Sequence, residues 1–425
     1  MSRPLRSALS ALCVAALLVP LLAATPQSNA ETIFATAEGL LRTGRIAEAR
    51  NSYLEIVDTF PRTTHPRLVW RAAARVRLGD LLWRSGEWQR AGAEYVDVVE
   101  FEPRSKWTSR ASLKLAYTAL AEEDWAAAID LLQRVVSATG KAADSDAATG
   151  ARRALALVER FHVRAANSAA PYLRSSVIDM GAEIDRPVAV AASSDGQVLV
   201  IDEGAPAVLL KDPARAVASR LAYNAHSRPW WGVDGLPYLP TRKAGVIALG
   251  GSRLGFMSDE HGRSMPLKDL QAGVRTPDGS WFLVDAEPRR VLKFDPDGTY
   301  RGLATTTHEE PVDVAIDGVG RLYVLDRAGS RVIRFAANGE REGVVVASQW
   351  RRPEALAVDR LGNSYVLDRD ARTIDVFSPA GQRLSRLGPT LPGNIELRAP
   401  RDLSVDDSGR IYIADRNARA VVIVE

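Results

Sequence analysis

The feature that most constrains the fold is a repeated five-residue string. "YVLDR" occurs at Tyr323–Arg327 and again at Tyr365–Arg369, and "YIADR" follows at Tyr412–Arg416. A Gly stands six residues before the Asp in five copies of the surrounding pattern, and a Pro stands nine residues before that Gly in four of them. Offsets that stay fixed over a period of about forty residues indicate an array of structural repeats.

Each copy predicts short β-strands separated by tight turns. Apolar and polar residues alternate in "VDVAID", "RLYVLD" and "RVIRF", which is typical of half-buried strands. The strings "DGVG", "DRLG" and "DDSG" place a Gly where a hairpin needs a positive φ. Three visible strands, with room for a fourth, predict that each copy is one blade of a β-propeller.

The spacing of the copies predicts six blades, one of them degraded. Asp202 and Asp285 are 83 residues apart, about twice the period, so a degraded blade is expected on "GVIALGGSRLGFMSDEHG", where Phe256 and Gly262 echo Phe294 and Gly298. The chain ends soon after the third strand of the last copy. The strand "RSSVIDMG", which precedes the first copy, is therefore predicted to supply the missing outer strand and to close the ring without an exposed edge.

The region from about Ala170 to Glu425 resembles the NHL-repeat family of six-bladed propellers. The residues that carry the resemblance are "RPEALAVDRLGNSYVLDRDARTIDVFSPAGQRL" and its sister copies. The resemblance implies the fold, and we take 175–425 as the propeller domain. It does not imply a function, because this fold hosts binding modules and enzymes alike.

The N-terminus predicts a secretory signal peptide over residues 1–30. Arg3 and Arg6 precede the apolar run Leu9–Ala24, and "SNA" ends in a cleavage site after Ala30. The run is 16 residues long, shorter than a membrane-spanning helix, although an uncleaved anchor is the alternative. Cys13, the one cysteine, lacks a small residue before it and leaves with the peptide, so the mature chain would have no thiol chemistry. We expect a periplasmic or extracellular location.

Residues 31–167 show a helical pattern instead. In "RLGDLLWRSGEWQRAGAEYVDVVEFEP" small residues let two helices approach closely, large residues fill the gap, and a Pro ends the second helix. The segment resembles tetratricopeptide (TPR) repeats, with three copies, a capping helix over 147–165, and a linker at 168–174. The predicted fold class is therefore α+β multidomain: an N-terminal α-helical TPR stack followed by an all-β six-bladed propeller.

The TPR resemblance implies a concave groove lined by the first helix of each repeat. Its candidate binding residues are Arg71, Arg75, Lys114 and Tyr117. Basic side chains there would suit an extended peptide with acidic groups or a free carboxylate. The alternative is that these arginines only solvate an outer helix face.

A second set of candidates lies on one face of the propeller. Antiparallel strands bring the end of strand two and the start of strand one to the same face, so Asp326, Asp368 and Asp415 meet the residues that flank the Pro of each copy. We expect the Asp residues to cap turns through their side chains. The neighbouring residues differ between blades and form a candidate binding face: Arg186, Glu310, Arg327, Arg352, Glu354, Arg369, Arg401 and Arg416.

One stretch, "YNAHSRPWWGVDGLPYLP", breaks the repeat. Arg228, Trp230 and Trp231 are predicted to lie in an irregular loop that could form a recognition platform, because Trp and Arg dominate binding hot spots. The alternative is that the aromatic side chains fill a blade whose ordinary strands are degraded.

No catalytic signature is present, so no catalytic residue, metal or cofactor is predicted. The five histidines are scattered, and no pair has the spacing of metal ligands. Basic and acidic residues nearly balance, 21 against 18 in residues 31–174 and 32 against 34 in 175–425, which gives no case for nucleic acid.

These observations predict an exported, non-enzymatic scaffold of the bacterial cell envelope that binds protein or peptide partners. The alternative is a metal-dependent hydrolase or lyase, with Glu310, Asp313, Glu354 and Asp402 around a channel metal.

Overall fold

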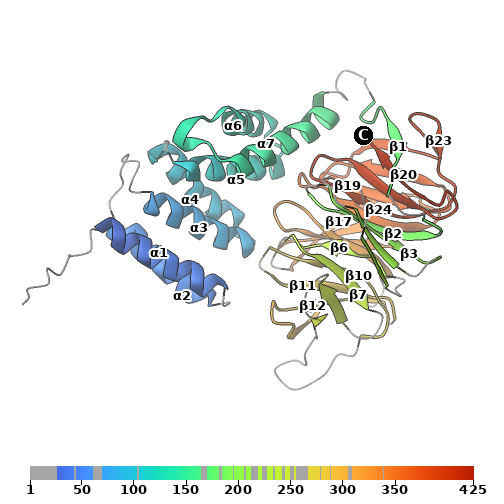
Figure 1. The fold of residues 1–425 in the computed structure, drawn as a ribbon, viewed down its shortest axis with the longest axis horizontal. Coiled ribbons are helices and arrows are strands. Elements are labelled where there is room, and N and C mark those ends of the chain that lie inside the picture. Colours follow the sequence, from blue (N-terminus) through green and yellow to red (C-terminus); the bar gives the residue numbers. More distant parts are fainter. Residues whose placement is uncertain are drawn as a thin grey trace, which may run out of the picture.

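The computed structural model consists of a helical N-terminal region followed by a β-propeller (Figure 1). It describes residues 26–42, 45–60, 69–102, 105–163, 170–180, 184–194, 196–204, 207–211, 219–222, 227–232, 235–241, 245–248, 253–254, 267–277, 279–287, 289–304, 309–337 and 339–425. Most of the predicted signal peptide lies outside these ranges, and the predicted cleavage site after Ala30 falls within the first helix. Within the described ranges, every helix is too short or too polar to span a bilayer.

The helical region is built from helix pairs with short connections. The pairs are α1 (Pro26–Arg42) with α2 (Ile46–Thr59), α3 (Trp70–Arg84) with α4 (Trp88–Phe101), and α5 (Lys106–Ala121) with α6 (Trp125–Ser137). A short turn η1 (Gly140–Ala142), helix α7 (Ser145–Val158) and the turn η2 (Glu159–Val163) follow. Three-residue connections make the two helices of a pair antiparallel neighbours.

Small residues set the close approach of these helices. Gly79 in α3 lies under the ring of Tyr95 in α4, so a Cβ there would be 2.6 Å from the ring. Ala91 and Tyr95 are completely buried, as Ala49 and Tyr53 are in the preceding pair. The sequence pattern of small and large residues therefore corresponds to real packing between paired helices.

The propeller contains five regular four-stranded blades. The first blade contains β2 (Pro187–Ala192), β3 (Val198–Asp202), β4 (Ala207–Lys211) and β5 (Ser219–Ala222), and the second contains β10 (Leu270–Arg275), β11 (Trp281–Asp285), β12 (Arg290–Phe294) and β13 (Tyr300–Leu303). The third contains β14 (Pro311–Ile316), β15 (Leu322–Asp326), β16 (Arg331–Phe335) and β17 (Arg341–Ala347), and the fourth contains β18 (Pro353–Val358), β19 (Ser364–Asp368), β20 (Thr373–Phe377) and β21 (Arg383–Leu387). The last contains β24 (Pro400–Val405), β25 (Ile411–Asp415), β26 (Ala420–Val424) and β1 (Ser175–Val177).

The predicted degraded copy is a reduced sheet rather than a full blade. It consists of β6 (Trp230–Trp231), β7 (Pro237–Thr241), β8 (Gly245–Ala248) and β9 (Arg253–Leu254), and two of its strands have only two residues. The count of six thus needs correction: five blades are complete, and the sixth copy is a short sheet between the first and second complete blades. It begins earlier than predicted, and the expected landmarks Phe256 and Gly262 lie outside the described residues.

The chain closes the propeller with its first strand. β1 pairs antiparallel with β26, and Ser175 lies opposite Val424. This confirms the prediction that the strand before the first copy supplies the outer strand of the last blade. A small hairpin, β22 (Thr390–Leu391) with β23 (Ile395–Glu396), leads into that blade.

The two faces of the propeller differ in what they contact. We call the end where each first strand begins the Asp face, because Asp326, Asp368 and Asp415 end the adjacent second strands there. We call the opposite end, where the first two strands of each blade are joined by a turn, the turn face. The helical region packs on the turn face.

Polar and apolar contacts join the two regions. Arg160 Nη1 in η2 donates to the carbonyl oxygen of Gly409 at 2.7 Å, and Tyr172 Oη donates to the same oxygen at 3.1 Å. Asp407 pairs with Arg360 at 2.7 Å and with Arg153 of α7 at 3.6 Å. A single apolar cluster continues from the helices into the blades. The helical region is therefore docked on the propeller rather than merely tethered to it.

Candidate functional site

The repeated Asp of the Asp face is a buried capping residue. Asp368 accepts hydrogen bonds from the backbone N–H groups of Arg351 (2.7 Å), Arg352 (3.1 Å) and Ala371 (3.1 Å). Asp415 repeats the arrangement with Arg398 and Ala399. A short side chain that satisfies several backbone donors fixes the turn that follows. The Asp of "YVLDR" thus positions the Arg beside it.

The Arg after this Asp reaches across to the next blade. Arg327 Nε donates to the Pro353 carbonyl oxygen at 3.2 Å, and its Nη2 donates to Glu354 Oε2 at 3.1 Å. Its Nη1 is also 3.4 Å from Glu310. At the closure of the ring, Arg416 Nη2 lies 2.8 Å from Glu203. These pairs connect neighbouring blades at the Asp face.

Glu354 is shared by three arginines. Besides Arg327, its Oε2 lies 3.3 Å from Arg352 Nε, and its Oε1 lies 3.9 Å from Arg369 Nη1. Glu354 and Glu310 together supply two negative charges against the three guanidinium groups of Arg327, Arg352 and Arg369. This part of the face is consequently electropositive.

Among the described residues Arg401 has no carboxylate within ion-pair distance, and its buried Nε makes no hydrogen bond. Burial, and then the proximity of Arg369 and Arg416, lower the pKa of Arg401 below its usual value, while the more distant Glu354 opposes this shift. Arg186, the remaining candidate on this face, is half exposed and lies 3.7 Å from Asp185. Of the predicted face residues, the structure brings together Glu310, Arg327, Arg352, Glu354, Arg369, Arg401 and Arg416, whereas Arg186 is paired with Asp185 beside the first blade.

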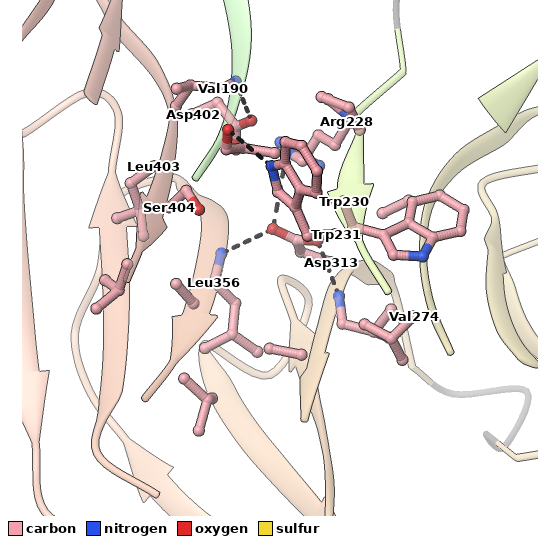
Figure 2. A pocket seen from close by; sticks show the side chains of 18 of the residues that line it. Val190, Arg228, Trp230, Trp231, Val274, Asp313, Leu356, Asp402, Leu403 and Ser404 are labelled. Atoms are coloured by element: carbon pink, nitrogen blue, oxygen red, sulfur yellow. Dashed lines mark hydrogen bonds and ion pairs between the residues drawn. The ribbon is translucent and has the colours of Figure 1, made fainter. Parts of the chain in front are cut away.

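The first strands surround a central channel with a cavity of about 170 Å³ (Figure 2). Its walls are mostly apolar, with side chains such as Val274, Leu356 and Leu403. Arg228 enters from the segment before β6 and lies beside two buried carboxylates, Asp313 of β14 and Asp402 of β24.

Arg228 holds the end of this channel by contacts with three inner strands. Its Nε lies 3.1 Å from Asp402 Oδ1 and 3.7 Å from Asp313 Oδ2. Its Nη1 and Nη2 donate to the carbonyl oxygens of Val312 (2.9 Å) and Glu354 (2.7 Å). The guanidinium therefore occupies the position between the carboxylates that a channel cation would need.

The two carboxylates also accept backbone hydrogen bonds. Asp313 accepts from Val314 N and Leu356 N, and Asp402 accepts from Val190 N. Burial raises the pKa of both carboxyl groups, while Arg228 opposes the rise. Among the residues that the structure describes, no group of three or more His, Cys, Asp or Glu side chains is placed to hold a metal ion.

The prediction of an irregular recognition loop was wrong for the two tryptophans. Trp230 and Trp231 form β6, the innermost strand of the reduced sheet. Trp230 is 8% exposed and stacks on Tyr238, which in turn meets Trp281 edge-on. Trp230 and Tyr238 therefore form part of the core of the reduced sheet, as the alternative interpretation of this stretch predicted.

The predicted groove residues are also part of the packing. Arg71 is 7% exposed and lies near Asp97 (3.5 Å) and Glu102 (3.6 Å), and Arg75 pairs with Asp97 at 2.8 Å. These arginines join α3 to the end of α4 instead of lining an open groove.

Lys114 and Tyr117 of α5 are also engaged within the protein. The ammonium group of Lys114 lies 5.0 Å from the centre of the Trp83 ring. Tyr117 is buried beside Arg360 of the propeller: burial opposes the charged form of Arg360, but Asp407 and Tyr117 raise its pKa above the usual value. The four predicted groove residues are therefore not available together to a peptide.

Sequence reasoning missed Asp407 and Arg360 as domain contacts, and Arg228 as the residue that fills the channel. Asp407 and Arg360 lie in turns between the first two strands of their blades. Charged residues are common in such solvated turns, so their presence there does not predict a contact between domains. Arg228 is a predicted binding residue of the irregular stretch, but no signal in the sequence indicates that its side chain enters the channel.

Comparison with known proteins gives a fold resemblance only. No known family model matches the chain, and no curated protein matches it. A structure of unknown function from Bacteroides thetaiotaomicron is similar with 15% identity and a TM-score of 0.45, covering 59% of this chain and 72% of its own.

Two similar structures carry enzyme names. A gluconolactonase from Xanthomonas campestris has 14% identity and a TM-score of 0.45 over 59% of this chain and 89% of its own. A streptogramin B lyase has 12% identity and a TM-score of 0.44 over 59% of this chain and 97% of its own.

Proposed function

We propose that this chain is an exported, non-enzymatic interaction scaffold of the bacterial cell envelope that binds a protein partner on the Asp face of its propeller. In this proposal the helical pairs are TPR-type repeats and the blades are NHL-type repeats. The observation that carries the proposal is the excess of arginine on the Asp face: Arg327, Arg352, Arg369, Arg401 and Arg416 are accompanied by Glu203, Glu310 and Glu354.

The arrangement of the two regions supports this choice of face. The helical region covers part of the turn face, where Arg160 contacts Gly409 and Arg153 contacts Asp407. Its predicted groove residues are engaged in internal contacts. The Asp face carries partly exposed arginines, and Arg is among the residues most enriched at binding hot spots.

The contacts of Arg228 favour a scaffold over the metal-dependent hydrolase or lyase. Such an enzyme would use Asp313, Asp402, Glu310 and Glu354 around a channel metal, but Asp313 and Asp402 already have a guanidinium between them. Glu310 and Glu354 are paired with Arg327. A divalent cation would have to displace these arginines before it could activate water.

The experiment is site-specific photo-crosslinking of the full-length chain in its native cells. A photoreactive residue replaces Arg352, whose side chain is 44% exposed on the Asp face, or Arg383, which is exposed on the outer strand β21. We expect a discrete crosslinked partner from position 352 and none from position 383. Equal labelling from both positions, or labelling from neither, would contradict the proposal.

A further inference from the structure

The repeat allows one contact between blades to be compared with its equivalent in the next pair of blades. Arg327 follows the Asp that ends β15, and Glu354 follows the Pro that begins β18. Where these two blades meet, Arg327 Nη2 is 3.1 Å from Glu354 Oε2. A positive side chain from one blade is thus neutralised by a negative side chain from the next.

The same two positions at the next contact hold two arginines. Arg369 follows the Asp that ends β19, and Arg401 follows the Pro that begins β24. The backbone is equivalent, because Arg327 N donates to Glu310 O (2.9 Å) and Arg369 N donates to Arg352 O (3.0 Å), and because Pro353 and Pro400 pair with the Asp residues Asp368 and Asp415. The Arg–Glu pair has become an Arg–Arg pair.

The neighbouring acidic side chains do not compensate for this change. Glu354 is 3.9 Å from Arg369 but closer to Arg327 and Arg352, and Glu203 pairs with Arg416. Across the described part of the chain Arg401 forms no ion pair, and its buried Nε lacks a hydrogen-bond acceptor. The guanidinium itself is only partly buried. A charged donor group without an acceptor is costly once it is shielded from water, so a strong acceptor brought by a ligand would be bound favourably.

We propose that Arg369 and Arg401 form a site for a carboxylate supplied by the partner protein, either an acidic side chain or a C-terminal carboxyl group. The inference rests on the proposed function and specifies the chemistry that the Asp face recognises. The partner's carboxylate takes the place that Glu354 has at the preceding contact. Paired guanidinium groups suit this ligand, because each presents a planar fork of N–H donors that matches a carboxylate.

One substitution should place a carboxylate of the protein itself in the proposed site. Arg401→Glu recreates the Arg–Glu pair at an equivalent position, so it removes the site without leaving a cavity or an unpaired donor. Arg383→Glu makes the same change of charge on the exposed outer strand β21 and is the matched control.

The probe is a fluorescent peptide with two adjacent glutamates in an otherwise neutral sequence and an amidated C-terminus. Its companions are the same peptide with two glutamines and the glutamine peptide with a free C-terminal carboxylate. Binding to the mature protein is followed by fluorescence anisotropy at low salt. Thermal unfolding of each variant is recorded in parallel.

We expect both carboxylate-bearing peptides to bind the wild type and the Arg383→Glu variant at least tenfold more tightly than the amidated glutamine peptide. Arg401→Glu abolishes this difference and unfolds at a higher temperature than Arg383→Glu, because it gains an internal ion pair. Undiminished binding by Arg401→Glu would overturn the proposal. Stronger competition by inorganic phosphate than by acetate would overturn the assignment to a carboxylate.

The two proposals fail in different ways. Loss of peptide binding in Arg401→Glu together with weaker photo-crosslinking from position 352 supports a carboxylate site occupied by the partner, whereas unchanged crosslinking would overturn the assignment of that carboxylate to the partner. Crosslinking without any carboxylate-dependent peptide binding overturns the carboxylate site and leaves the scaffold proposal intact.

Discussion

Nε of Arg228 lies 3.1 Å from Oδ1 of Asp402, although the two residues are 174 positions apart in the chain. The contact joins the segment before the reduced sheet to an inner strand of the last blade. Through Val312 O and Glu354 O, the same guanidinium also contacts the two inner strands that precede that blade. One side chain thus satisfies acceptors from three neighbouring blades around the channel.

We predict that Arg228→Ala destabilises the propeller by about 3–5 kcal/mol, since removing one partner of a buried ion pair leaves the other charge uncompensated. Urea unfolding followed by tryptophan fluorescence measures the change. Arg228→Ala combined with Asp313→Asn and Asp402→Asn should recover part of the loss, because the buried charges are then gone. A loss below about 1 kcal/mol for Arg228→Ala would contradict the role assigned to this residue.

A glycine of the propeller, Gly409, lies against helix α7 where the helical region is docked on the turn face. A Cβ at Gly409 would lie 2.4 Å from Leu157 Cδ2 of α7, and the φ of Gly409 is +76°. Gly320 has the equivalent place in another blade and a φ of +86°, but a Cβ there would be no closer than 3.5 Å to its nearest neighbour, Pro277.

We predict that Gly320→Ala costs only the conformational penalty of a positive φ, about 1 kcal/mol. Gly409→Ala should cost the same and in addition displace α7 from the propeller. Small-angle X-ray scattering would then show a larger radius of gyration for Gly409→Ala than for Gly320→Ala. Identical scattering from the two variants would mean that the contact with Leu157 does not hold the regions together.

The strands and the capping Asp residues could be predicted from the sequence because their signals are local. A Gly in a hairpin turn and an Asp six residues later occupy fixed places in every blade, so five copies reinforce one another. The same comparison of copies shows the change of charge at the position after the Pro, which holds Glu354 in one blade and Arg401 in the next.

The remaining contacts could not be predicted because they depend on residues far apart in the chain. A strand of two residues shows no alternation, so the sequence alone does not reveal that Trp230 and Trp231 form a strand. Composition does not distinguish a solvated arginine from one that pairs internally, so the sequence does not reveal that Arg71 lies 3.6 Å from Glu102. The role of Arg228 depends on partners 84 to 174 residues away.

A further prediction concerns the capping role of Asp368. Its carboxylate accepts three backbone hydrogen bonds, so Asp368→Ala leaves several donors unpaired and should cost about 3 kcal/mol. Asp368→Asn retains one acceptor oxygen and should cost less. Asp370→Ala, at an exposed neighbour, should lie within about 0.5 kcal/mol of the wild type. Chemical denaturation compares the three variants, and equal losses for Asp368→Ala and Asp370→Ala would refute the capping role.

The last prediction concerns the pH dependence that Glu102 gives to the helical region. Glu102 lies at the C-terminus of α4, 4% exposed, beside Arg71. Burial raises the pKa of Glu102 to about 7; Arg71 opposes the rise, and Asp97 adds to it. In the unfolded chain a glutamate has a pKa of about 4.3.

Between these two pKa values the native protein binds more protons at Glu102 than the unfolded chain does. Its contribution to the free energy of unfolding therefore falls as the pH rises from about 4.3 to about 7, and it is restored on acidification. Glu102→Gln is neutral throughout, so its stability relative to the wild type should increase by about 2–3 kcal/mol between pH 5 and pH 8.

Urea unfolding of the wild type and of Glu102→Gln at pH 5, 6, 7 and 8 measures this difference. Glu100→Gln, at an exposed position of α4, controls for the loss of one negative charge. A difference between wild type and Glu102→Gln that stays constant across the four pH values would show that Glu102 is ionised throughout, and that the ion pair with Arg71 outweighs its burial.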